Sequence, residues 1–210
     1  MIKLLRLFIP ALLVIFAAAC DNATDAANSN GPSAADILGN ADYPAVSYGG
    51  YREKTRDIAP TKAQLAEDMK ILSAMGIKVL RTYNTSQFPQ ARLLLEVISE
   101  LIQADPSFEM YVMLGAWIEA HNSWNGGYWS EEEKAMIGDT DHSRGDEVKN
   151  GMEIDTAVAL AKQYPDIVKV IAVGNEAMVQ WAVNYFVYPK TILKWVNHLQ
   201  ELKAKGELPA

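Results

Sequence analysis

Polar and aromatic side chains follow several apolar segments of this sequence, and the carboxylate of Glu176 stands out among them. The run from 167 to 173 is rich in β-branched residues, and Gly174, Asn175 and Glu176 follow it directly. Such a run is typical of a strand that is buried on both faces. Polar groups just after a parallel strand lie where α/β folds place their chemistry. We therefore predict that Asn175 and Glu176 belong to a functional site.

Three earlier apolar segments end in the same way. The residues at their ends are Tyr48 after the first, Arg81, Tyr83 and Asn84 after the second, and Trp117 and Glu119 after the third. Taken singly, each has a structural explanation, because a strand arginine often pairs with a carboxylate and a tryptophan often packs in a core. Their shared placement favours a cleft lined by aromatic rings, a cation, amides and a carboxylate. Such a lining suits a sugar, which has apolar C–H faces and polar rims.

Strand-like and helix-like segments alternate along the chain. We expect strands at 44–50, 77–84, 108–114 and 167–173, and helices at 61–75, 89–105, 150–164 and 190–205. Thr61 and Gln64 form a capping-box pattern, Pro89 opens the second helix, and Gly76 and Gly206 end the first and last. Between 178 and 186, in an aromatic segment, we expect one short helical turn or more.

Four successive β-α units predict a parallel sheet with helices outside it. The sheet could be open and doubly wound, or it could belong to a barrel. A nucleotide-binding doubly wound fold has a glycine fingerprint that leads into a helix, whereas Tyr48-Gly49-Gly50-Tyr51 leads into a loop. A (β/α)8 barrel needs about 250 residues, so this chain would supply roughly the first four units.

The first nineteen residues predict export. Lys3 and Arg6 precede an apolar run too short to span a bilayer comfortably, and Ala17-Ala18-Ala19 suits signal peptidase. Cys20 is the only cysteine, and its position resembles a bacterial lipoprotein lipobox. We expect a signal peptide at 1–19, lipidation of Cys20 and a flexible tether over 20–41. Residues 42–210 would then be anchored in the cell envelope and face the periplasm or exterior. The alternative is ordinary cleavage that leaves a free thiol.

The composition and charge of the chain limit the kinds of partner that it can bind. The chain of 210 residues carries a net charge of −7, or −9 without Lys3 and Arg6. This balance argues against nucleic acid, which requires a basic face. We expect no cofactor and no metal, because the acidic residues between 139 and 147 lack the EF-hand pattern. In the long segment 119–150, Trp124, Tyr128 and Trp129 could form a sugar platform or could pack the loop itself.

Several of these segments together resemble glycoside hydrolase family 17, the β-1,3-glucanase and glucanosyltransferase family. Val173-Gly174-Asn175-Glu176 resembles its fourth-strand signature. The other similar segments, in family order, are Tyr48-Gly49-Gly50-Tyr51-Arg52, Leu80-Arg81-Thr82-Tyr83, Leu114-Gly115-Ala116-Trp117-Ile118 and Glu153-Ile154. The ordered set is far more specific than an isolated Asn-Glu pair.

The resemblance implies a (β/α)8 barrel and a retaining mechanism, in which Glu176 is the general acid/base. It implies that Asn175 binds the sugar 2-hydroxyl, that Arg81 supports the charge of the site, and that Tyr48, Tyr83 and Trp117 shape the subsite. The family nucleophile comes from a seventh strand. Glu201 and Glu207 lie on or just after a helix and do not suit that role, and Glu119 is expected to be a loop or rim residue.

The chain is therefore expected to be the N-terminal half of a β-1,3-glucan hydrolase or transglycosylase that is inactive alone. One alternative is a non-catalytic, membrane-tethered glucan-binding lipoprotein. The other is a periplasmic ligand-binding lobe.

Overall fold

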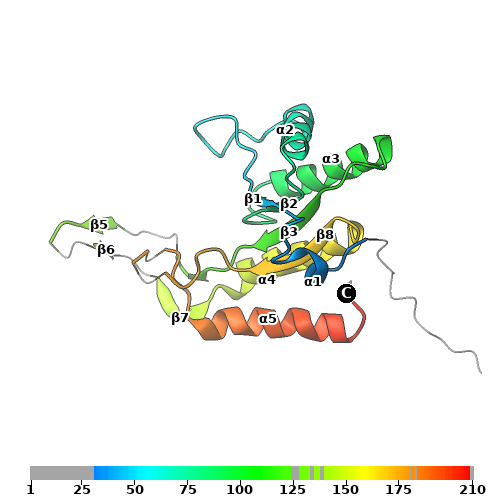
Figure 1. Cartoon of the computed structure of the whole chain (residues 1–210). Helices are drawn as coiled ribbons and strands as arrows, with labels where there is room; N and C mark the ends of the chain where they lie inside the picture. Colours follow the sequence, from blue (N-terminus) through cyan, green and yellow to red (C-terminus); the bar gives the residue numbers. More distant parts are fainter. Residues whose placement is uncertain are drawn as a thin grey trace, which may run out of the picture.

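The computed structural model describes residues 31–123, 128–132, 135–137, 140–179, 181–182 and 184–208. Its centre is a parallel sheet of four strands: β1 (Ala45–Ser47), β2 (Val79–Arg81), β3 (Tyr111–Ala116) and β8 (Val168–Val173) (Figure 1). The order β1-β2-β3-β8 follows the chain without the reversal of a doubly wound sheet. The prediction of an α/β fold with a parallel sheet is confirmed.

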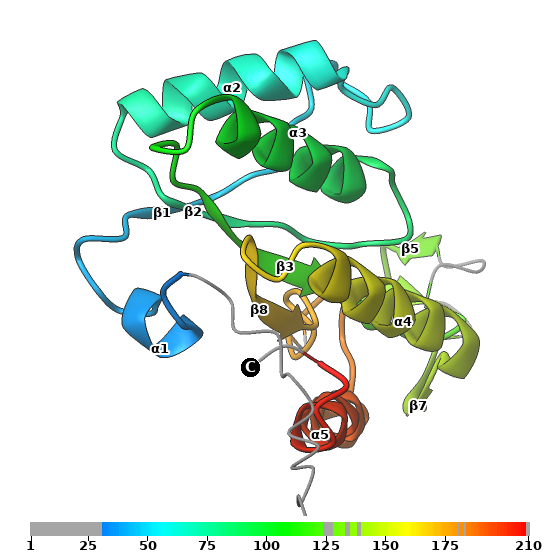
Figure 2. The same cartoon turned by 90° about the vertical axis from the view of Figure 1, so that its right-hand side faces the viewer.

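Three helices cover one face of this sheet: α2 (Lys62–Ala74), α3 (Gln90–Ala104) and α4 (Glu147–Gln163) (Figure 2). The helix α5 (Pro189–Ala204) follows β8 and packs near it. Thr61 caps α2 with Gln64 in the predicted capping box, whereas α4 begins earlier than expected, after the N-cap Asp146. The buried core between sheet and helices includes Leu65, Met69, Leu80, Leu94, Ile98, Val112, Leu114, Ile154 and Leu160.

The pairing register decides which strand residues face the helices. Leu80 is paired with Val112, and both belong to the core. Because side chains alternate along a strand, Arg81 points to the opposite face, together with its partner Met113. Arg81 therefore lies on the face that α2, α3 and α4 leave uncovered.

The expected tether is partly wrong. A short helix, α1 (Ala34–Ile37), begins at a capping box formed by Ser33 and Asp36, and the side chain of Ile37 is buried. This helix lies on the other side of the sheet from α2 and α3 (Figures 1 and 2). Within 33–41, Ile37 is the one buried residue, and most of its neighbours are exposed. The predicted signal peptide and Cys20 lie outside the described residues.

The long connection after β3 contains strands that its lack of periodicity did not predict. β4 (Ala120–His121) pairs antiparallel with β7 (Asp141–Gly145), and β5 (Tyr128–Ser130) pairs antiparallel with β6 (Ala135–Ile137). The side chains of Trp124, Tyr128 and Trp129 lie outside the described residues. In the described part of 178–186 the chain forms turns, and the N–H of Phe186 donates to the carbonyl of Ala182 as in one helical turn, without a longer helix. Within those same described ranges, no helix is long and apolar enough to cross a membrane.

Candidate active site

Glu176 occupies a strained turn at the carboxyl end of β8. Its φ is +50°, in the left-handed region that non-glycine residues avoid at a cost of about 1–2 kcal/mol. Gly174, with φ +84°, begins the turn, and a Cβ there would lie 3.0 Å from Ala177 and Ile192. The turn leaves the side chain of Glu176 exposed at the edge of the sheet. Strain of this kind is concentrated at functional positions.

Arg81 orients Asn175 across the sheet. The guanidinium Nη2 of Arg81 donates to Oδ1 of Asn175 at 2.6 Å, which links β2 to the turn after β8. Arg81 also lies over the ring of Tyr83, 5.3 Å from its centre. Because a guanidinium only donates, the amide oxygen of Asn175 must face Arg81. The NH2 group of Asn175 is then oriented away from Arg81, as a donor for a ligand oxygen.

Tyr83, Asn175 and Glu176 border a hollow of about 700 Å³, which lies within the usual range of ligand sites. The described residues that line it are Gly49, Tyr51, Arg56, Tyr83, Asn84, Gln87, Trp117, Asn175, Glu176 and Tyr185. We call this hollow the cleft. Trp117 meets Tyr185 edge-to-face, with ring centres 5.3 Å apart. Among the described lining residues, Glu176 is the only carboxylate.

A buried carboxylate on α4 holds two walls of the cleft together. Glu153 is only 3% exposed and accepts hydrogen bonds from the backbone N–H of Ser86 at 2.8 Å and of Trp117 at 3.0 Å. It also accepts from the N–H of Thr85 and the hydroxyl of Ser86. One side chain thus joins the loop after β2 to the end of β3. These two segments carry Tyr83, Asn84 and Trp117.

The first strand contributes a different tyrosine from the one predicted. The hydroxyl of Tyr48 donates to Asp68 of α2 at 2.8 Å, and Arg52 pairs with the same carboxylate. Burial raises the pKa of Tyr48, and the hydrogen bond to Asp68 adds to that rise. Tyr48 is absent from the described cleft lining, where Tyr51 takes its place.

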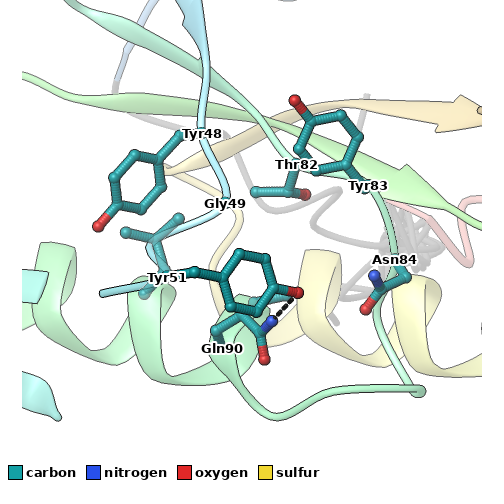
Figure 3. A pocket seen from close by; sticks show the side chains of 9 residues that line it. Tyr48, Gly49, Tyr51, Thr82, Tyr83, Asn84 and Gln90 are labelled. Carbon is teal, nitrogen blue, oxygen red and sulfur yellow. Dashed lines mark hydrogen bonds between the residues drawn. The ribbon is translucent and has the colours of Figure 1, made fainter. Parts of the chain in front are cut away.

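Tyr48 and Tyr51 instead meet around a small cavity of about 20 Å³ (Figure 3). Gln90 donates to the Tyr51 hydroxyl there, and the hydroxyl of Tyr48 points away from Tyr83 and Asn84. The expectation that Tyr48 shapes the subsite is therefore corrected: its hydroxyl donates to Asp68, and Tyr48 is not among the described residues that line the cleft. Side chains alternate along a strand, and this alternation places the side chain of Tyr48 on the side of α2. The two glycines after Tyr48 hide the alternation in the sequence.

Glu119 lies in the loop between β3 and β4, as expected, but its side chain is buried rather than exposed at a rim. It is 6% exposed, and its Oε1 accepts from Nζ of Lys149 at 2.6 Å. Its Oε2 accepts from the indole N–H of Trp117 at 3.3 Å. Its backbone N–H and carbonyl both bind the side chain of Asn150. These contacts give Glu119 a supporting position behind Trp117.

Several cleft residues were not predicted from the sequence: Tyr51, Arg56, Gln87 and Tyr185. The second tyrosine of Tyr48-Gly49-Gly50-Tyr51 was visible as a candidate, and Tyr185 lies in the aromatic segment after Glu176. Arg56 and Gln87 lie in loops whose sequence carries no such signal. No group of three or more His, Cys, Asp or Glu residues suited to a metal ion occurs in the part of the chain that the structure describes.

Comparison with known proteins gives one informative similarity. No family model matches the chain, and neither does any curated protein sequence. The crystal structure of an endo-laminarinase from Formosa Hel1_33_131 is similar, with a TM-score of 0.76 and 54% sequence identity. The match covers 84% of this chain and 42% of the laminarinase chain. The chain thus spans less than half the length of the protein that it resembles.

Proposed function

We propose that this chain carries the acid/base side of the active site of a retaining glycosidase of family 17 that acts on β-1,3-glucan. The observation that carries the proposal is that Asn175 and Glu176 line one cleft with Tyr51, Tyr83 and Trp117, and that Arg81 donates to Asn175. The 54% identity to an endo-laminarinase supports the choice of glucan.

Each group has a role in that chemistry. The carboxyl of Glu176 gives its proton to the glycosidic oxygen as the bond breaks, and then takes a proton from the incoming water or sugar hydroxyl. The NH2 group of Asn175, held by Arg81, donates to a hydroxyl of the reacting sugar. The faces of the aromatic rings cover the apolar face of the pyranose. Hydrolysis and transglycosylation both use these groups.

A retaining enzyme needs a second carboxylate about 5 Å from the first. Because Glu176 is the only carboxylate among the described cleft residues, we propose that further units of a (β/α)8 barrel supply the nucleophile. The parallel strands in chain order, with helices over one face, support such a barrel. We further propose a lipid anchor at Cys20 in the envelope, on the basis of the leader sequence.

The alternative is a glucan-binding lipoprotein without catalysis, which the single carboxylate favours. Both functions require selective binding, which titration calorimetry measures. We expect β-1,3-linked oligosaccharides to bind at least about tenfold more tightly than β-1,4-linked ones, a difference of about 1.4 kcal/mol. Equal affinity for the two series, or none for either, would contradict both functions.

Reaction with azide then distinguishes the glycosidase from the non-catalytic lipoprotein. Azide and an activated aryl β-glucoside should slowly give the α-glycosyl azide, because azide attacks the face opposite the leaving group while Glu176 assists departure. The β-azide would show that Glu176 is the nucleophile instead. Binding with no azide product would favour the lipoprotein.

A further inference from the structure

A second hollow lies beside the cleft and shares a wall with it. Its volume is about 360 Å³, and its lining residues are Ser86, Gln87, Trp117, Glu119, Lys149, Met152 and Glu153. We call it the side pocket. Trp117 and Gln87 line both hollows, so they form the boundary between them. A ligand in the cleft could therefore extend past this boundary.

The side pocket combines buried charge with an exposed apolar rim. Lys149 is held by Glu119 at 2.6 Å, while its side chain remains 52% exposed. An ammonium has three N–H donors, and Asp146 is 3.9 Å away, too far for a hydrogen bond. Donors thus remain for a ligand. Met152 is 59% exposed, an unusual position for a large apolar side chain in the second turn of α4.

The charges of the lining select against ionic ligands. Glu119 and Glu153 contribute two carboxylates against the one ammonium of Lys149. The net negative lining would repel an anionic ligand. The ammonium of Lys149 already lies where a cationic ligand would bind. Both carboxylates are also committed to hydrogen bonds from the protein. A neutral ligand with hydroxyl groups and an apolar face fits best, because it can accept from Lys149 and cover Met152 and Trp117.

We propose that the side pocket binds one glucosyl unit of the glucan, beyond the units held in the cleft. This inference rests on the proposed function and adds a specificity site to it. The unit could belong to the main chain or to a side branch, since both offer the same pyranose chemistry. Lys149 donates to its hydroxyls, and Met152 and Trp117 contact its apolar face.

Titration calorimetry on the whole chain tests the proposal with linear β-1,3-gluco-oligosaccharides of increasing length, and with the same backbones bearing one glucosyl branch. Lys149→Met keeps the aliphatic stem and removes the donors, and should weaken the ligands that reach the side pocket about tenfold. Disaccharide binding should not change. Lys194→Met is the matched control, because Lys194 is also half-exposed and paired with a glutamate, Glu147.

Lys149→Met leaves Oε1 of Glu119 without its ammonium partner and could impair folding, so Met152→Glu is a second, independent variant. It removes the apolar rim at an exposed position and should weaken the same ligands as Lys149→Met. A selective loss for branched ligands assigns the pocket to a branch, and a loss for long linear ligands assigns it to the main chain.

If both variants bind every ligand with wild-type affinity, the side pocket does not bind a glucosyl unit, whereas the proposed function still holds. If the wild-type protein binds no β-1,3-glucan, the proposed function fails, and the inference fails with it.

Discussion

Replacing Glu153 by glutamine tests whether one carboxylate holds the two walls of the cleft. Oε1 of Glu153 accepts from Trp117 and Thr85, and Oε2 accepts from Ser86. Glutamine keeps one acceptor oxygen and turns the other into a donor, which would oppose the N–H of Ser86. A hydrogen bond to a charged group contributes about 1.5–3 kcal/mol. Removing a buried charge offsets part of this loss, so we expect about 2 kcal/mol of destabilisation.

That loss corresponds to a fall in Tm of about 4–8 °C for a domain of this size. Denaturant unfolding gives the free energy directly, and Glu100→Gln is the control. Glu100 is also on a helix and forms an ion pair with Lys62, but its side chain is 60% exposed. Exposed pairs of this kind contribute about 0–1 kcal/mol. Glu153→Gln should also weaken binding of the glucan, because Tyr83, Asn84 and Trp117 lose their common anchor.

Equal destabilisation in Glu153→Gln and Glu100→Gln would refute the anchoring role of Glu153. A destabilised Glu153→Gln that binds glucan like the wild type would limit Glu153 to a structural role.

Three further predictions concern single contacts. A double-mutant cycle of Arg81→Met and Asn175→Ala should give a coupling of about 1.5–3 kcal/mol in the free energy of unfolding, because the 2.6 Å bond is charge-assisted; additive effects would contradict it. Glu176→Gly should raise the free energy of unfolding by about 0.5–1 kcal/mol, since relief of left-handed strain exceeds the added entropy cost of glycine, whereas Glu176→Ala should give no such gain. The raised pKa of Tyr48 means that the unfolded chain loses this proton first as the pH rises above about 10, so stability falls there; Tyr48→Phe should fall less steeply in urea titrations, and identical slopes would oppose the burial argument.

The sequence predicts where the site lies better than it predicts which side chains enter it. Apolar runs and caps located the four strands and the helices, because burial and capping are local signals. They also placed Asn175 and Glu176 at the sheet edge. The prediction for Tyr48 was wrong because the choice between Tyr48 and Tyr51 depends on which face each takes, before and after Gly49 and Gly50. The strands within the long connection were not predicted, because strands as short as β4 carry too few residues for a periodic pattern.

For Glu153, the sequence pattern supports a stronger prediction than the family resemblance alone. The buried positions of α4 include Asn150, Glu153, Ala157 and Leu160, which recur at helical spacing on one face. A carboxylate on such a face must find donors, because an unpaired buried charge is too costly. At the sheet edge, the nearest donors are the backbone N–H groups of loops that have just left the sheet. A charged residue on the apolar face of a crossover helix therefore indicates an anchor for the loops of the site, and the same reasoning explains why Asn150 binds the backbone of Glu119.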